Sequence, residues 1–193
     1  MPLEESPSRR AAKRWMAALW YTWFLLASLS WALKIWRFFW HRLPDRMTDR
    51  LPLWGLGILG LVLVAYAGSK IVRLGKAGVA ALMCTGLGYW FLTFRVCEYP
   101  AERVHLPTYG LVAWLYFLAF RSHMGPWRAT GAALLVGTCV GFVDECIQWA
   151  LPDRRFGWND VWLNFLSVAL GLCLVRVLLM TRDEQPATAT NGD

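Results

Sequence analysis

Residues 141–171 read GFVDECIQWALPDRRFGWNDVWLNFLSVALG, and this stretch decides the fold. It consists of two long apolar segments joined by a short polar hinge, a pattern that predicts two membrane helices. Charged and amide side chains are costly inside lipid, so their concentration around the hinge marks a place where the protein needs them. These side chains belong to Asp144, Glu145, Gln148, Arg154, Arg155, Asp160 and Asn164.

The composition is that of a membrane protein. Of the 193 residues, 57% are hydrophobic and 13 are Trp, more than a soluble domain of this size would carry. The net charge of +7 comes from Lys and Arg at the ends of apolar segments, where such residues contact lipid headgroups and orient the chain. No basic stripe alternates with aromatic residues on a polar surface, so we expect no nucleic-acid partner.

Six apolar segments are each close to the roughly 20 residues that a helix needs to cross a bilayer. We therefore predict an all-α integral membrane protein, a helical bundle of about six transmembrane helices. A polar N-terminal tail (1–14) precedes the N-terminal transmembrane helices (15–94), and a region with three further helices (95–181) precedes a disordered C-terminal tail (182–193). The predicted spans are 15–33, 51–72, 77–94, 105–120, 129–151 and 160–180, with a polar loop at 41–50 and a basic turn at 69–76.

The distribution of Lys and Arg predicts the orientation. The N-terminal tail and the loops on its side of the bilayer carry a small excess of these residues over the other side, and an excess of Lys and Arg marks the cytoplasm. We expect a multi-pass protein of the cytoplasmic (inner) membrane, with both termini cytoplasmic and the hinge on the outer side.

The predicted order of the spans places three helix ends at one membrane depth. The fourth span begins, the fifth ends and the sixth begins on the same side, so His105, Glu145 and Asp160 share a depth whichever side that is. Helical periodicity then predicts that each helix turns one polar stripe toward a common cavity. The stripes are His105, Tyr109, Val112 and Tyr116; Gly137, Gly141, Glu145 and Gln148; and Asp160, Asn164, Ser167 and Gly171.

Besides transport or a proton relay, three functions are compatible with these stripes. The polar groups can hold three helices together as a scaffold without a ligand. They can bind a polar or anionic headgroup, with Arg154 as the anion contact. They can also form an acid/base or metal-assisted membrane hydrolase or transferase acting on a lipid-linked substrate, with His105, Glu145 and Asp160 as catalytic candidates.

Recognisable signatures of bound groups are missing from the sequence. It has no HExxH motif and no serine in a nucleophile elbow. Its five cysteines form no CxxC pair, so we expect neither a disulfide framework nor a zinc site, and the thiols are interpreted as small apolar groups in packing. We accordingly predict no metal and no cofactor.

The hinge residues resemble the second motif of the VanZ-like membrane protein family. That motif consists of an acid-x-x-Gln pair, Pro-x-Arg, Asp-x-x-x-Asn and a Gly in the last helix. A first motif, acid-basic-x-His followed by Tyr-Gly, is similar to residues 102–110, although Thr108 stands where many members have Glu. The matching residues are Glu145, Gln148, Pro152, Arg154, Asp160, Asn164 and Gly171, with Glu102, Arg103, His105, Tyr109 and Gly110.

This resemblance covers about residues 95–180 and makes 95–181 the VanZ-like region. The family takes its name from a protein linked to resistance to teicoplanin, a glycopeptide antibiotic that acts at the outer face of the bacterial membrane. The resemblance implies a cell-envelope protein linked to glycopeptide resistance or envelope homeostasis. Its outward-facing polar pocket would engage a lipid or glycan headgroup, with membrane lipids and a lipid-linked envelope precursor as partners. The expected binding residues are Glu102, Arg103, His105, Tyr109, Glu145, Gln148, Arg154, Asp160 and Asn164.

Overall fold

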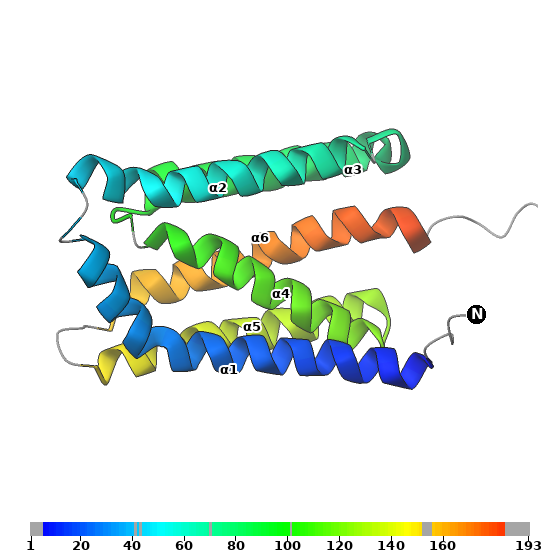
Figure 1. Ribbon diagram of the computed structural model, residues 1–193. Coiled ribbons are helices and arrows are strands. Elements are labelled where there is room, and N and C mark those ends of the chain that lie inside the picture. Colours follow the sequence, from blue (N-terminus) through cyan, green and yellow to red (C-terminus); the bar gives the residue numbers. More distant parts are fainter. Residues whose placement is uncertain are drawn as a thin grey trace, which may run out of the picture.

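A computed structural model describes residues 6–40, 42, 44–69, 71–100, 102–151 and 156–183, and these residues form helices and connections without a strand. The long helices run up and down along one another (Figure 1). A π-helical turn, η1 (Leu92–Val96), ends α3, and a short 3₁₀ turn, η2 (Glu102–Val104), leads into α4. The helices are α1 (Pro7–Trp40), α2 (Asp45–Gly68), α3 (Ile71–Phe91), α4 (His105–Arg121), α5 (Pro126–Trp149) and α6 (Trp158–Asp183).

Three of the described helical stretches are long and apolar enough to cross a membrane. They are Leu74–Val96, Pro126–Trp149 and Trp158–Leu179. The helix α4 has 17 residues, and the apolar part of α2 is the shorter stretch Arg50–Tyr66. The all-α architecture is therefore confirmed, with three helices that could cross a membrane, whereas the number of six spans stays a prediction.

Several helices extend beyond the apolar segments that predict them. The helix α1 begins at Pro7, inside the predicted polar tail, and α2 begins at Asp45, inside the predicted loop 41–50. Proline suits a first helical position because its fixed φ matches the helix and its missing N–H would lack a helical partner there. The length of an apolar segment indicates how much of a helix is covered by lipid. It does not determine where the hydrogen-bonded helix ends.

The two other predicted connections also differ in detail. The helix α6 continues to Asp183, so two residues of the predicted disordered tail 182–193 are helical, and residues 184–193 lie outside the described part of the chain. The predicted basic turn 69–76 already contains the start of α3, but its backbone breaks at Gly75, with φ 61° and ψ 176°. Positive φ is readily adopted only by glycine, so this residue allows the chain to turn there.

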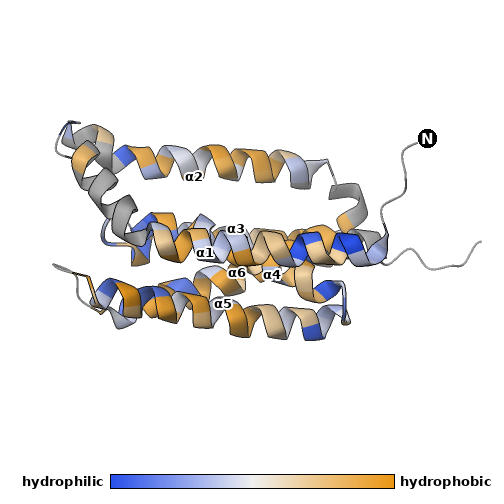
Figure 2. Ribbon diagram, turned by 60° about the horizontal axis from the view of Figure 1, so that its bottom comes forward, coloured by the Kyte–Doolittle hydropathy of each residue, from blue (hydrophilic) through white to orange (hydrophobic). Residues whose placement is uncertain are grey.

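The helices α4, α5 and α6 form the centre of the bundle. The helix α4 packs against α6, α5 and α1, and α3 packs against α6. In Figure 1, α2 and α3 lie along one side of this centre, and α1 lies along the other side, next to α5. Hydrophobic residues occupy most of the length of the helices, and hydrophilic ones gather toward their ends (Figure 2), as a membrane environment requires.

Glycines bring the three central helices close together. A Cβ atom on Gly171 of α6 would lie 2.7 Å from the Cα atom of Gly110 on α4, so the two backbones touch at this crossing. On α5, a Cβ atom at Gly137 would lie 2.9 Å from Val168, and one at Gly141 would lie 2.8 Å from the Cβ atom of Asn164. Small residues allow this approach, which in lipid replaces the hydrophobic effect as a source of helix association.

The crossing of α4 and α6 predicts a specific sensitivity to substitution. Gly171→Ala would place a methyl group against the Gly110 backbone, which cannot rotate away as a side chain can. Overpacking of this kind costs about 1–3 kcal/mol. We expect the variant to unfold in detergent at a lower temperature than the unmodified chain.

Gly131→Ala is the matched control, because a Cβ atom at Gly131 on α5 would meet nothing within 4 Å. We expect its thermal midpoint to stay at or slightly above that of the unmodified chain, since alanine is the better helix former. Equal thermal midpoints for the two variants would contradict the close approach of α4 and α6 at Gly110 and Gly171.

Candidate functional site

A polar cluster lies where α4 begins, α5 ends and α6 begins. It consists of His105 and Tyr109 from α4, Asp144, Glu145 and Gln148 from α5, and Asn164 from α6. Figure 1 places this end of the bundle opposite the end at which α1 starts and α6 finishes. The cluster is buried: Glu145 is 0% exposed, and Asp144 and Asn164 are each 1% exposed.

The polar stripe of α5 includes a residue that the sequence interpretation left out of the site. Gly137, Gly141, Glu145 and Gln148 are all buried, as the stripe predicts, but Asp144 is buried beside them. Residues 137, 141, 144 and 148 follow the helical spacing i, i+4, i+7, i+11, so helical periodicity was a signal that could have identified Asp144.

Each carboxylate accepts a hydrogen bond from another side chain of the cluster. The Tyr109 hydroxyl donates to Asp144 Oδ2 over 2.5 Å, joining α4 to α5. Gln148 Nε2 donates to Glu145 Oε1 over 3.1 Å, from the next turn of the same helix. These two contacts orient both carboxyl groups.

The amide of Asn164 determines which ring nitrogen of His105 carries a proton. Asn164 Nδ2 donates to the carbonyl oxygen of Gly141 over 3.3 Å, which fixes the orientation of the amide. Asn164 Oδ1 then faces His105 Nδ1 at 2.8 Å and can only accept. His105 Nδ1 is therefore the protonated nitrogen, and in the neutral ring the lone pair is on Nε2.

The His105 ring lies next to the two carboxylates. It stacks on the Tyr109 ring, with 5.8 Å between centroids and 13° between planes. One ring nitrogen of His105, one carboxylate oxygen of Asp144 and one of Glu145 all lie within 4.8 Å of one another. The structure thus brings together two of the three catalytic candidates, His105 and Glu145, and adds Asp144 to them.

Asp160 occupies a different place from the other predicted residues of its stripe. Asn164 and Ser167 are buried, whereas Asp160 is half-buried in the first turn of α6. A carboxylate there is favourable, because the N-terminus of a helix carries a partial positive charge. Asp160 is close enough to Cys97, the first residue after η1, to act on its thiol electrostatically.

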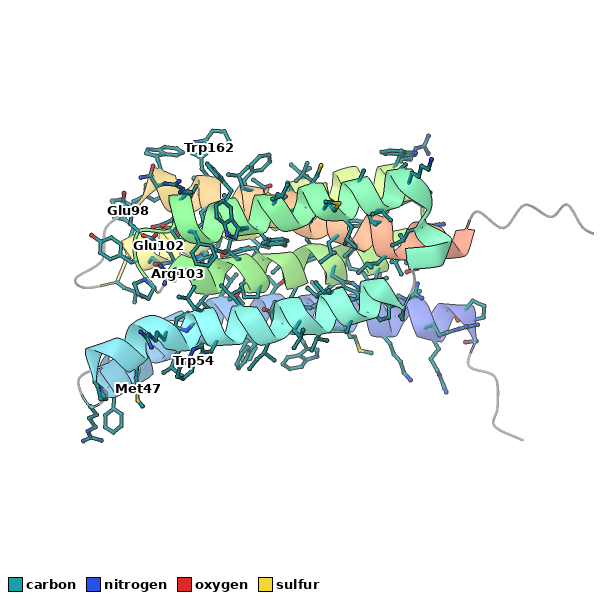
Figure 3. All side chains as sticks on the ribbon, turned by 90° about the horizontal axis from the view of Figure 1, so that it is seen from above. Met47, Trp54, Glu98, Glu102, Arg103 and Trp162 are labelled. Atoms are coloured by element: carbon teal, nitrogen blue, oxygen red, sulfur yellow. The ribbon has the colours of Figure 1, made fainter. Side chains whose placement is uncertain are left out.

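Glu102 and Arg103 lie on the connector that leads into α4, at the same end of the bundle as Glu98 and Trp162 (Figure 3). Glu102 Oε2 accepts the backbone N–H groups of Glu98 at 2.8 Å and of Tyr99 at 3.2 Å. This carboxylate therefore holds the connector in shape. Arg103 Nε is buried and makes no hydrogen bond within the described part of the chain.

Of two further positions of the family motifs, Thr108 lies in the described part of the chain and Arg154 does not. The hydroxyl of Thr108, which stands where many family members have Glu, donates to the carbonyl oxygen of Val104 over 2.7 Å, within its own helix. Arg154, the predicted anion contact, and its neighbours in residues 152–155 lie outside the described residues.

An apolar cavity of about 650 Å³ lies elsewhere, between α2 and α3 on one side and α4 and α6 on the other. Its walls include both glycines of the α4–α6 crossing, Gly110 and Gly171, whereas no residue of the polar cluster lines it. The cavity therefore lies on the other side of that crossing from the cluster. Its surface suits a hydrocarbon chain rather than a headgroup.

The hydrogen bond between Tyr109 and Asp144 predicts the effect of removing one hydroxyl. Tyr109→Phe leaves the Asp144 carboxylate without its donor from α4, and a buried acceptor that loses its donor costs about 1–3 kcal/mol. We expect a lower thermal midpoint in detergent. Tyr99→Phe is the control, because Tyr99 is 65% exposed; equal effects of the two substitutions would contradict this arrangement.

The surroundings of Cys97 predict slow alkylation. Burial, reinforced by the Glu102 carboxylate, raises the pKa of the Cys97 thiol from 9.0 to about 11. Only the thiolate reacts, so at pH 8 a two-unit rise in pKa lowers its amount about 100-fold. In a variant that keeps only Cys97, iodoacetamide should react about 100-fold more slowly with the folded protein than with the protein denatured in SDS. The rate for the folded protein should rise about tenfold with each pH unit up to pH 10.

Equal alkylation rates in the folded and denatured protein would show that Cys97 is not buried next to these acids.

The comparison with protein families agrees with the motifs. A family model described as VanZ/LLP1 matches residues 15–179, which include the N-terminal helices as well as the motif-bearing half. Comparisons with curated proteins and with solved structures find no match. Because the family model covers most of the sequence, from the first helix to the last, the chain belongs to the VanZ/LLP1 family of membrane proteins.

Proposed function

We propose that the polar cluster engages the headgroup of a membrane lipid or of a lipid-linked envelope precursor. The observation that carries this proposal is the burial of two adjacent carboxylates, Asp144 and Glu145, at a junction of three helices near one end of a membrane bundle. His105 and Asn164 complete the cluster from the two other helices.

The cost of burying charge argues against a purely structural role. Two carboxylates removed from water lose solvation that their contacts must offset, and replacing buried ions with apolar groups is often neutral or stabilising. Helices that only need to be held together can use glycines and neutral amides, which this bundle also has. Ionisable residues kept inside a membrane protein are therefore functional candidates.

The chemistry of the cluster suits a headgroup rich in hydroxyl or amine donors. Ionised carboxylates only accept hydrogen bonds, and Asp144 and Glu145 together offer four oxygens. Glycan hydroxyls and ethanolamine are donors of this kind. Arg154, which occupies the arginine position of the family motif, would add the contact with an anionic group such as a phosphate.

The orientation proposed from the Lys and Arg distribution places the cluster on the outer side of a bacterial cytoplasmic membrane, with both termini inside. Lipid-linked precursors of the cell wall are used on that side, and a protein that engages their headgroups could alter access of a glycopeptide antibiotic to them. A link to glycopeptide resistance or envelope homeostasis is part of this proposal.

A second candidate is a hydrolase or transferase acting on a lipid-linked substrate. The observation that favours it is the proximity of the His105 ring to both carboxylates, within 4.8 Å. A neutral imidazole with its lone pair on Nε2 can accept a proton from an attacking hydroxyl or water, as a general base does. Product formation from a lipid-linked substrate would distinguish this activity from binding alone.

Binding of lipid to a carboxylate variant tests the proposal. The protein is reconstituted in nanodiscs of bacterial phospholipid with added lipid-linked glycan precursor, and bound lipid is measured by native mass spectrometry. Glu145→Gln keeps the shape of the side chain and removes its charge. We expect at least about tenfold weaker retention of the specific lipid, equivalent to 1.4 kcal/mol.

Glu98→Gln is the control, because this acid lies on the exposed connector at the same end of the bundle. It should retain lipid as the unmodified chain does, and both variants should accumulate in the membrane at normal levels. If the unmodified chain and Glu145→Gln retain every lipid species equally well, the headgroup proposal is wrong.

A further inference from the structure

We propose that His105, Asp144 and Glu145 bind one divalent transition-metal ion, of the Mn²⁺ or Zn²⁺ type. This differs from the expectation drawn from the sequence, which contains no familiar metal-binding motif. The site stands on the geometry of the cluster. Its further role, supplying positive charge to hold the phosphate of a headgroup, rests on the proposed function.

The three residues offer a suitable set of donor atoms. One imidazole nitrogen and two carboxylate oxygens converge from α4 and α5, within 4.8 Å of one another. Ligands at about 2.0–2.2 Å from such an ion lie about 3 Å apart, so side-chain adjustment alone would close the site. Imidazole combined with carboxylates suits Mn²⁺ and Zn²⁺, whereas Mg²⁺ and Ca²⁺ prefer oxygen alone.

The state of the His105 ring is the one that a metal ligand needs. Asn164 Oδ1 accepts the proton of Nδ1 at 2.8 Å, and the Gly141 carbonyl fixes that amide from a third helix. The lone pair of the neutral ring is then on Nε2, which accepts no hydrogen bond from the described residues. Metal-binding histidines are oriented in this way, by a donor bond from the other ring nitrogen to an oxygen.

Each carboxylate has an orienting partner of its own. The Tyr109 hydroxyl donates to Asp144 Oδ2, and Gln148 Nε2 donates to Glu145 Oε1. Every candidate ligand thus has a separate residue that holds it, which is the usual second layer of a metal site.

The donor set also leaves room for a further ligand, because three side chains do not fill the coordination shell of such an ion. An ion held in this way has open coordination positions, which water or a phosphate oxygen can fill. The ion would place positive charge between a phosphate and the carboxylates of Asp144 and Glu145, in addition to the contact proposed for Arg154.

Metal binding by the purified full-length chain tests the inference. The protein in detergent is stripped with EDTA, incubated with Zn²⁺ or Mn²⁺, desalted and analysed by elemental mass spectrometry, with electron paramagnetic resonance for Mn²⁺. We expect about one ion per chain. We expect His105→Gln, Asp144→Asn and Glu145→Gln each to weaken binding at least about tenfold.

His123→Ala and Glu98→Gln are the controls, because both side chains are exposed and neither belongs to the group of three ligands. They should bind the ion as the unmodified chain does. The inference is overturned if the unmodified chain retains no ion, or if the three cluster variants retain as much as the controls, which would indicate adventitious surface binding.

A second measurement does not depend on the folding of any carboxylate variant. An ion that binds only the folded state raises the thermal midpoint as its concentration increases. We expect this rise for the unmodified chain and not for His105→Gln, in which only the half-buried residue changes. Equal rises in both proteins would contradict the site.

The same samples separate this inference from the proposed function. If the unmodified chain retains its lipid in EDTA and binds no ion, the metal site is wrong and headgroup binding stands. If the chain binds the ion through His105 but retains no specific lipid, the metal site stands and headgroup binding is wrong.

Discussion

The burial of Asp144 and Glu145 side by side is the constraint on which the rest of the structure depends. Groups of this kind are costly in a membrane protein, and here three helices meet around them. Tyr109 reaches Asp144 from α4, and Asn164 reaches the α5 backbone from α6. Glycines at 110, 137, 141 and 171 bring the same three helices close together, and Gly141 lies directly against Asn164 and Tyr109. The polar cluster and the glycine crossings are therefore two parts of one arrangement.

Much of this arrangement could be predicted from the sequence, because both lipid and helical periodicity leave clear patterns. The predicted stripes of α4 and α5 are buried along their length, apart from the half-buried His105. On α6, the burial of Asn164 and Ser167 agrees with the predicted stripe. The membership of the VanZ family, inferred from residues at fixed spacing, is confirmed. Asp144 was missed because the predicted stripe of α5 passed from Gly137 to Glu145 at i+8. Asp144, at i+7 from Gly137, lies on the same helix face.

Other features depend on information that the sequence does not display. The position of Asp160, half-buried near Cys97 rather than inside the cluster, follows from how α6 begins and how the connector 97–104 folds against it. The helix ends at Pro7 and Asp45 follow from backbone hydrogen bonding, which continues past the apolar residues. The tautomer of His105 needs three atoms from three helices, and no single segment contains them.

The account holds that Asp144 and Glu145 are kept for a ligand and not for the stability of the bundle. The most direct test is the free energy of unfolding of the double variant Asp144→Asn/Glu145→Gln in detergent, without added metal or lipid. Both new amides can still accept the bonds from Tyr109 and Gln148, while two buried charges disappear. The account predicts a stability equal to or greater than that of the unmodified chain. A loss of about 3–5 kcal/mol, the size seen when a buried ion pair is broken, would show instead that the charges hold the helices together.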